Sequence, residues 1–140
     1  MRHALRVVLG VLIALSATGC PTTQERLLDS NVDQLKVRSI ETRSFDTADR
    51  KAVLRATVAT LQDLGFVVDK ADGDLGTVTA TKLAGYSARV TVTVRPKGDK
   101  QVTVRASIEH NERTVEDPQT YQDFFSALGK SLFLSANEVD

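Results

Sequence analysis

One cysteine, Cys20, has the most distinctive chemistry in this chain, because no second cysteine accompanies it. With a single thiol, the chain cannot form an internal disulfide or a metal site that needs several thiolates. In an oxidising compartment a lone thiol tends to pair with a second molecule, and covalent modification of the sulfur removes that hazard. The first chemical question is therefore what becomes attached to Cys20.

The residues before Cys20 have the three parts of a secretory signal: a basic start, a short apolar run and a small-residue end. Arg2 and Arg6 are followed by apolar residues 7–15, which are too few to cross a membrane because a spanning helix needs about 20. The small residues ending at Cys20 resemble the lipobox of bacterial lipoproteins, although Ala17 stands where that family more often has leucine. The resemblance implies that the cysteine receives a lipid and becomes the first mature residue. The alternative is an ordinary cleaved signal with an incidental cysteine.

This interpretation divides the chain into a signal peptide at 1–19, a lipidated flexible tether at 20–34 and a single α+β domain at 35–140. A flexible tether of about 14 residues typically reaches about 20 Å, so the domain would stay close to the membrane. Pro21 is not the aspartate that is associated with inner-membrane retention of lipoproteins in enteric bacteria. We therefore expect the protein in the cell envelope, anchored to the inner leaflet of the outer membrane and facing the periplasm.

Charge and aromatic content exclude several classes of partner. The chain has 18 basic and 18 acidic residues, and loss of Arg2 and Arg6 with the signal would leave a net charge of −2. This balance gives no general attraction to nucleic acid or to an anionic membrane surface. There is no tryptophan, and two tyrosines and five phenylalanines are too few for a surface that stacks on bases or sugar rings. We expect no nucleic-acid partner.

No group of residues in the sequence has the spacing of a catalytic or metal site. His110 is the only histidine beyond the predicted signal, and no nucleophile or further metal ligand is grouped with it, so we interpret it as a solvated loop residue. There is neither a Gly-x-Ser-x-Gly motif nor a phosphate-binding glycine loop. Asp69, Asp72 and Asp74 cluster around Gly73 without the EF-hand spacing, and turn formation explains them better. The sequence predicts no cofactor, no metal and no enzymatic activity.

Alternating residues in the predicted strands provide one polar surface with the chemistry for recognition. If the valines face the core, the candidate partner-binding residues face solvent; they are Arg89, Arg95, Arg105, Thr91 and Thr103, with Thr77, Thr79, Thr81 and Thr93 beside them. Arginine suits carboxylates and phosphates, and threonine adds hydroxyl groups. The alternative is that these residues only favour strand formation and keep an exposed sheet soluble. We expect the melting curve to stay nearly unchanged when Arg89 and Arg105 are both replaced by alanine.

Periodicity predicts the elements that carry these residues. Apolar residues at spacings of three and four predict a helix at 47–64, with Asp46 as its cap and Gly65 as its stop. Strict alternation predicts four strands between 66 and 108, and a poorer pattern predicts a strand at 35–44. An acidic cap and a proline begin a last amphipathic helix. We expect an α+β fold, an antiparallel sheet of about five strands with two helices packed on one face, in the order β-α-β-β-β-β-α.

Several runs in this domain resemble small, largely uncharacterised lipoproteins of Gram-negative bacteria. The likeness covers about residues 38–134 and rests on the runs at 44–47, 61–66, 75–76, 80–82, 121–125 and 130–134. These motifs are caps, turns and core positions, so the resemblance implies a fold rather than an activity. The element order is also similar to the helix-grip domains of the BamC lipoproteins of the outer-membrane β-barrel assembly machine, which carry two such domains.

Two functions are compatible with these features. The favoured one is a membrane-anchored periplasmic lipoprotein that acts as a non-enzymatic interaction or assembly module, with an envelope protein or the cell wall as its partner. The alternative is a small envelope enzyme that acts on a cell-wall or lipid substrate. The lack of any nucleophile–base or metal grouping in the sequence favours the first.

Overall fold

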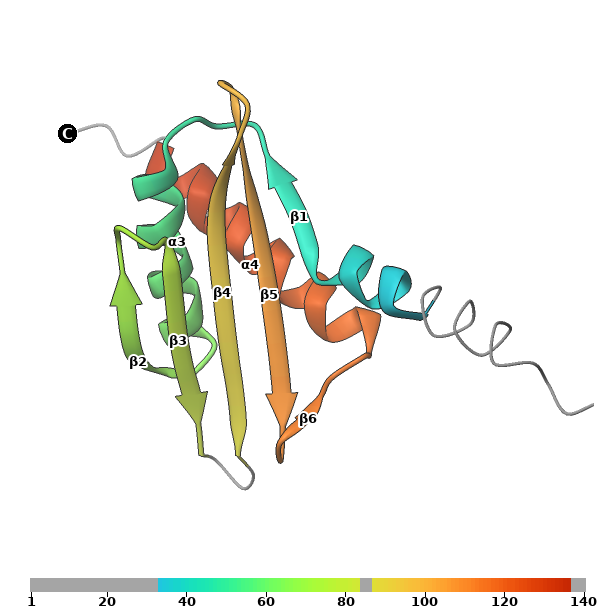
Figure 1. The fold of residues 1–140 in the computed structure, drawn as a ribbon. Coiled ribbons are helices and arrows are strands. Elements are labelled where there is room, and N and C mark those ends of the chain that lie inside the picture. The colour runs from blue at the N-terminus through green and yellow to red at the C-terminus, as the bar shows by residue number, and fades with distance from the viewer. Residues whose placement is uncertain (1–32, 84–86, 137–140) are drawn as a thin grey trace, which may run out of the picture. The chain divides into compact units, whose positions relative to one another are not determined.

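One antiparallel sheet and two helices form the two layers of the domain (Figure 1). The computed structural model describes residues 33–83 and 87–136, so the predicted signal peptide, Cys20 and most of the predicted tether lie outside the described residues. Within these two ranges, helices α3 (Arg50–Asp63) and α4 (Pro118–Ala136) pack on the same face of a six-stranded sheet. The predicted α+β fold is confirmed, with one short strand and one short helix more than expected.

The strands pair in an order that differs from their order in the chain. Their bounds are β1 (Thr42–Phe45), β2 (Val67–Asp72), β3 (Thr77–Lys82), β4 (Ala88–Lys97), β5 (Gln101–His110) and β6 (Arg113–Thr114). The order across the sheet is β1-β5-β4-β3-β2, and β6 pairs with the far end of the β5 edge that β1 also uses. The long hairpin of β4 and β5 therefore forms the centre of the sheet.

Alternation of valine with polar residues separates the two faces of this sheet. In β4 the side chains of Val90, Val92 and Val94 are at most 1% exposed, while the residues between them are more accessible to solvent. Leu61 from α3 and Leu128 from α4 cover the same face, and both side chains are fully buried. The core therefore lies entirely between the sheet and the helices, which leaves the opposite sheet face polar.

Helix α3 begins three residues later than the sequence predicted. Asp49, rather than Asp46, is its N-cap, because an Asp49 carboxylate oxygen accepts a hydrogen bond from the Ala52 N–H at 2.8 Å. Both aspartates have the chemistry for this role. Asp46 instead accepts a hydrogen bond from the Gln101 side chain at 2.6 Å, so the pairing of β1 beside β5 decides which aspartate caps the helix.

The C-terminal end of α3 follows the predicted glycine stop. Gly65 has a φ of +81°, which glycine adopts without the penalty that a side chain would bring. The Phe66 N–H then donates to the Leu61 carbonyl at 2.9 Å. The Lys82 ammonium, from the end of β3, donates to the Leu64 carbonyl at 2.9 Å and lies 5.6 Å from the centre of the Phe66 ring. A basic side chain thus occupies the negative end of this helix.

Helix α4 has an acidic cap of the kind that the sequence predicted. The Asp117 carboxylate accepts hydrogen bonds from the Thr120 hydroxyl at 2.7 Å and from the Thr120 N–H at 3.0 Å. These bonds, the hydroxyl first, favour the charged form and lower the pKa of Asp117 below its usual 3.8. The stabilising effect is therefore complete above that usual value and is lost as the pH falls through the lowered pKa.

The predicted strand at 35–44 is wrong in its first part, because residues 33–40 are helical and only Thr42–Phe45 joins the sheet. Val37 and Ile40 are partly buried, and Ile40 packs against the core, whereas Leu35 is largely exposed. Val37 and Ile40 are three residues apart, which places them on the same side of a helix. In a strand, Leu35 and Val37 would instead have shared one face. The Glu41 N–H donates to the Val37 carbonyl at 3.0 Å, and the chain then enters β1.

Between the parts of β5 that pair with β1 and with β6, other groups form hydrogen bonds with the free edge of β5. The Ala106 N–H donates to the Glu41 carbonyl at 2.8 Å, and the Ile108 N–H approaches the Tyr121 hydroxyl at 3.4 Å. The same hydroxyl donates to the Val115 carbonyl at 2.8 Å. Because the Tyr121 side chain is buried, desolvation raises its pKa above the usual value of 10.0. The hydroxyl therefore remains protonated and continues the hydrogen bonding of the sheet edge.

Candidate functional site

All five predicted partner-binding residues lie on the sheet face that points away from the helices, here called the outer face. Strand pairing sets threonine opposite threonine there, with Thr79 beside Thr91 and Thr77 beside Thr93. In Figure 1 both helices lie behind the sheet, and no other described element covers its front. The outer face is thus a broad polar surface that is open to solvent.

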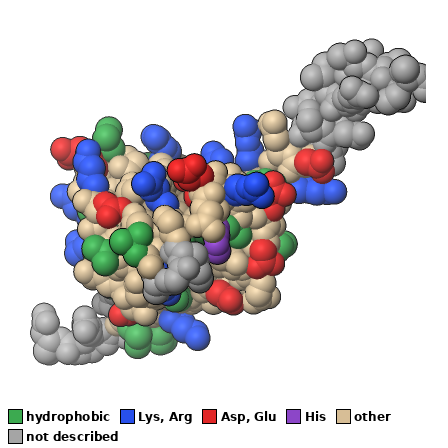
Figure 2. Space-filling view, turned by 90° about the horizontal axis from the view of Figure 1, so that it is seen from below, with side chains coloured by type: hydrophobic (Ala, Val, Ile, Leu, Met, Phe, Trp, Pro, Cys, Tyr) green, Lys and Arg blue, Asp and Glu red, His purple; other side chains and the backbone are tan. Residues whose placement is uncertain are grey.

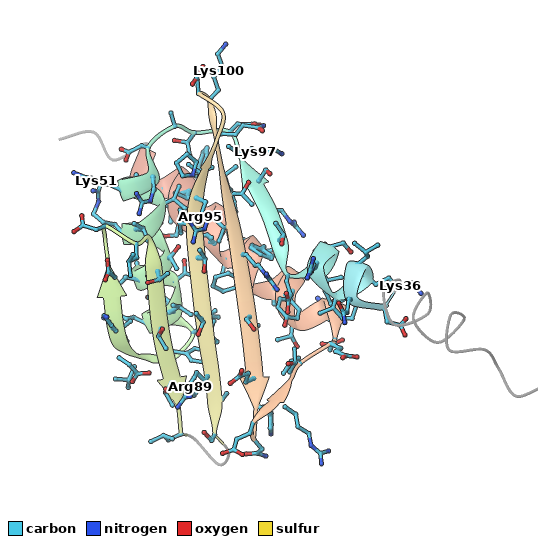
Figure 3. The ribbon with its side chains drawn as sticks, viewed as in Figure 1. Lys36, Lys51, Arg89, Arg95, Lys97 and Lys100 are labelled. Carbon is cyan, nitrogen blue, oxygen red and sulfur yellow. The ribbon has the colours of Figure 1, made fainter. Side chains whose placement is uncertain are left out.

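The predicted arginines do not form a single cluster on this face. Arg89 and Arg95 are six residues apart on β4, which corresponds to about 20 Å along an extended strand. Figure 3 shows them toward opposite ends of that strand. Arg95 is directly opposite Thr103, and Arg105 is directly opposite Thr93. This makes Arg95 and Arg105 diagonal neighbours at about 7–8 Å, whereas Arg89 stands apart.

Arg105 already has a partner within the domain. Its Nε and Nη2 atoms lie 3.1 Å and 2.9 Å from Oε2 of Glu41, in an ion pair that joins the chain just before β1 to β5. The Glu41 side chain is only 3% exposed, while the Arg105 side chain is 53% exposed. A nearly buried carboxylate needs this cation, because water cannot solvate it fully. This ion pair argues against the expectation that the melting curve stays nearly unchanged in the double variant, and it assigns the expected loss of stability to Arg105.

We expect Arg105→Ala to lower the free energy of unfolding by about 2 kcal/mol, because the buried Glu41 carboxylate loses its charged hydrogen-bond donors. This expected loss of stability is smaller than the loss for a fully buried ion pair, because the Arg105 side chain is exposed to water. Arg89→Ala is the matched control on the same face, and its effect should stay within about 0.5 kcal/mol. Urea denaturation of both variants tests this, and equal small losses would contradict a structural role for the ion pair.

Arg95, like Arg89, is a cation of the outer face that is available to a partner, and it has Arg105 and two threonines close to it. Among the residues that the structure describes, it forms no ion pair. Thr93 precedes it by two on the same face, and Thr103 lies opposite. We call Arg95, Thr93, Thr103 and Arg105 the arginine site. The guanidinium group of Arg95 and the adjacent threonine hydroxyl groups can together bind a carboxylate.

Of the aspartates around Gly73, Asp72 serves the turn between β2 and β3, whereas Asp69 lies within β2 and accepts a hydrogen bond from the Thr81 hydroxyl of β3 at 2.6 Å. Oδ1 of Asp72 accepts hydrogen bonds from the N–H groups of Asp74 at 3.1 Å and Leu75 at 2.8 Å. Arg50 of α3 donates to the carbonyls of Gly73 at 2.9 Å and Asp74 at 2.7 Å, which ties the turn to the start of the helix. In the described part of the chain, no three histidine, cysteine, aspartate or glutamate residues are grouped as metal ligands.

A second candidate site, which sequence reasoning missed, lies at the end of the domain where β3 and β5 finish. It is a cleft of about 350 Å³ between the sheet, the end of α3 and the start of α4. Most of its lining is apolar and comes from all of these elements, including Leu61, Phe66, Val90, Ile108 and Phe124. Figure 2 views the molecule from this end, where hydrophobic, acidic and basic side chains and a histidine reach the surface.

The register of the strands places two basic residues at this cleft. Lys82 pairs with Ala88 and Ala88 pairs with His110, so all three lie in one row on the helix-facing side of the sheet. His110 is exposed, as predicted, but it ends β5 rather than standing in a loop. Asp123 of α4 also lines the cleft. The cleft brings together residues 82, 110 and 123, and no local sequence pattern signals that proximity.

Comparison with known proteins adds no assignment to either site. Among the residues described, no helix combines the length and the apolar character that crossing a membrane requires. The chain matches no model of a known protein family, and no curated protein is similar enough in sequence to match it.

Proposed function

We propose that this chain is a membrane-anchored periplasmic lipoprotein that acts as a non-enzymatic interaction module of the cell envelope. In this proposal a lipid on Cys20 holds the domain at the membrane, and the arginine site binds an acidic protein. The observation that supports it best is the position of Arg95. Its guanidinium stands on an uncovered polar face and forms no ion pair within the described residues.

The shape of the outer face favours a protein over a small ligand. Small-molecule sites are usually concave and mostly apolar, whereas this face is an open sheet surface that carries threonine and arginine. Arginine is enriched at protein interfaces, where its fork pairs with carboxylates. The distance of about 20 Å between Arg89 and Arg95 also suits a broad contact better than one small anion.

Chemical crosslinking in cells, followed by mass spectrometry of the captured proteins, tests this function. We expect Arg95→Ala to reduce capture of the main partner about tenfold while the domain stays folded, because a charge-assisted hydrogen bond to a carboxylate is lost. Arg55→Ala is the matched control, since Arg55 is an exposed arginine on α3 in the other layer. An unchanged capture pattern in folded Arg95→Ala would contradict the proposal. Capture of cell-wall peptide alone would show that the partner is the cell wall rather than a protein.

A further inference from the structure

The cleft opens to solvent at one end of the domain, between the sheet, the end of α3 and the start of α4. At about 350 Å³ the cleft falls within the usual range for small-molecule sites, near its lower limit. Ala88 and Val90 of β4 line it, and the small side chain of Ala88 stands in the strand register between Lys82 and His110. One slender apolar group would fill this space.

The cleft also carries opposite charges on opposite sides. Lys82 comes from the sheet, and its ammonium uses one of three N–H donors on the Leu64 carbonyl. Asp123 comes from α4, and its Oδ1 accepts a hydrogen bond from the Gln119 side chain at 2.7 Å. Both groups therefore keep hydrogen-bonding capacity for a ligand, one as a donor and the other as an acceptor.

These features select among amphiphiles by charge. A fatty acid offers a carboxylate to Lys82 but no cation to Asp123, and a purely cationic amphiphile offers a cation to Asp123 but no anion to Lys82. A zwitterionic head group meets both partners, with its phosphate toward Lys82 and its amine toward Asp123. The volume limits the apolar part to a single acyl chain.

We propose that this cleft binds a single-chain zwitterionic phospholipid, with the acyl chain between α3, α4 and the sheet. The head group lies at the cleft surface between Lys82 and Asp123. This site is on the helix-facing side of the sheet, so it is distinct from the outer face, and neither proposal depends on the other.

Titration calorimetry with lauroyl lysophosphatidylethanolamine, below its critical micelle concentration, tests the proposal. The protein is the full chain carrying Cys20→Ser, which excludes a covalently attached lipid. We expect saturable binding that Ala88→Leu weakens at least about tenfold, because the larger side chain occupies the cleft. Ala59→Leu is the matched control: Ala59 is exposed on α3 and lines a different groove, so binding should not change.

A second pair of measurements tests the head group and does not require a change in the core. We expect laurate, with the same chain length, to bind more weakly than the lysophospholipid, and Asp123→Asn to narrow or reverse that difference. Asp123 is exposed, so this variant should fold normally. Absence of saturable binding, or unchanged binding in folded Ala88→Leu, would overturn the site. Equal affinity for laurate and the lysophospholipid in the unsubstituted cleft would overturn the zwitterionic ligand.

Discussion

We expect Leu61→Ala to lower the free energy of unfolding by about 2–5 kcal/mol, and we expect the same loss for Phe124→Ala. Denaturant melts of the chain from residue 21 onward measure both losses. Leu61 is 0% exposed and Phe124 is 4% exposed, and they come from the two different helices. Each substitution removes apolar contacts to the valine face of the sheet and leaves space that the surrounding strands cannot close.

The control for these two variants is Leu75→Ala in the turn between β2 and β3, where the leucine side chain is 63% exposed. Its effect should be below about 0.5 kcal/mol, because little apolar surface is withdrawn from water there. Losses below about 1 kcal/mol at both Leu61 and Phe124 would show that the helices do not depend on these faces for packing.

Cys20→Ser should move the protein from the membrane fraction to the soluble fraction, because this thiol is the one attachment point for the proposed lipid. Cell fractionation measures the distribution, and mass spectrometry of the purified wild-type chain measures the added lipid. Pro21→Ser is the matched control, since it changes the adjacent residue and keeps the thiol. A wild-type chain without lipid mass, together with a Cys20→Ser chain that stays in the membrane fraction, would contradict the lipoprotein proposal.

Local patterns were sufficient to predict most elements of this fold. The valine–threonine alternation depends only on neighbours two residues apart, and the apolar stripe of α3 depends on spacings of three and four. Both patterns predicted the correct element type. The pattern at 35–44 was poor, and there Val37 and Ile40 follow a helical spacing instead. Alternation therefore predicted strands reliably only where it extended through several residues.

Features that depend on pairing between distant residues could not be predicted in this way. The choice of Asp49 over Asp46 as a cap follows from where β1 ends beside β5. The ion pair between Glu41 and Arg105 joins residues 64 positions apart, so no local pattern announces it. The outer face was predicted as a surface because alternation defines it, but the separation of Arg95 from Arg89 within it needed the strand register.

The cleft is the clearest example of this limit. It depends on how far the end of α3 and the start of α4 lie from the sheet, which is a property of packing rather than of sequence periodicity. Ala88 gave the one available signal, as a small residue in a strand whose other core positions are valines. By itself that signal does not distinguish a cavity from a close approach of a helix.

The ion pair between Glu41 and Arg105 also stands where a mechanical load would enter the domain. Tension applied along the chain from its N-terminal side reaches the sheet at Glu41, immediately before β1, which is short and pairs with β5 as its one neighbouring strand among the described residues. Because Arg105 lies on the central hairpin strand β5, the pair passes this load into the most extensively paired part of the sheet. We therefore expect the Glu41–Arg105 pair to resist separation of β1 from β5 when the domain is pulled by its N-terminal segment.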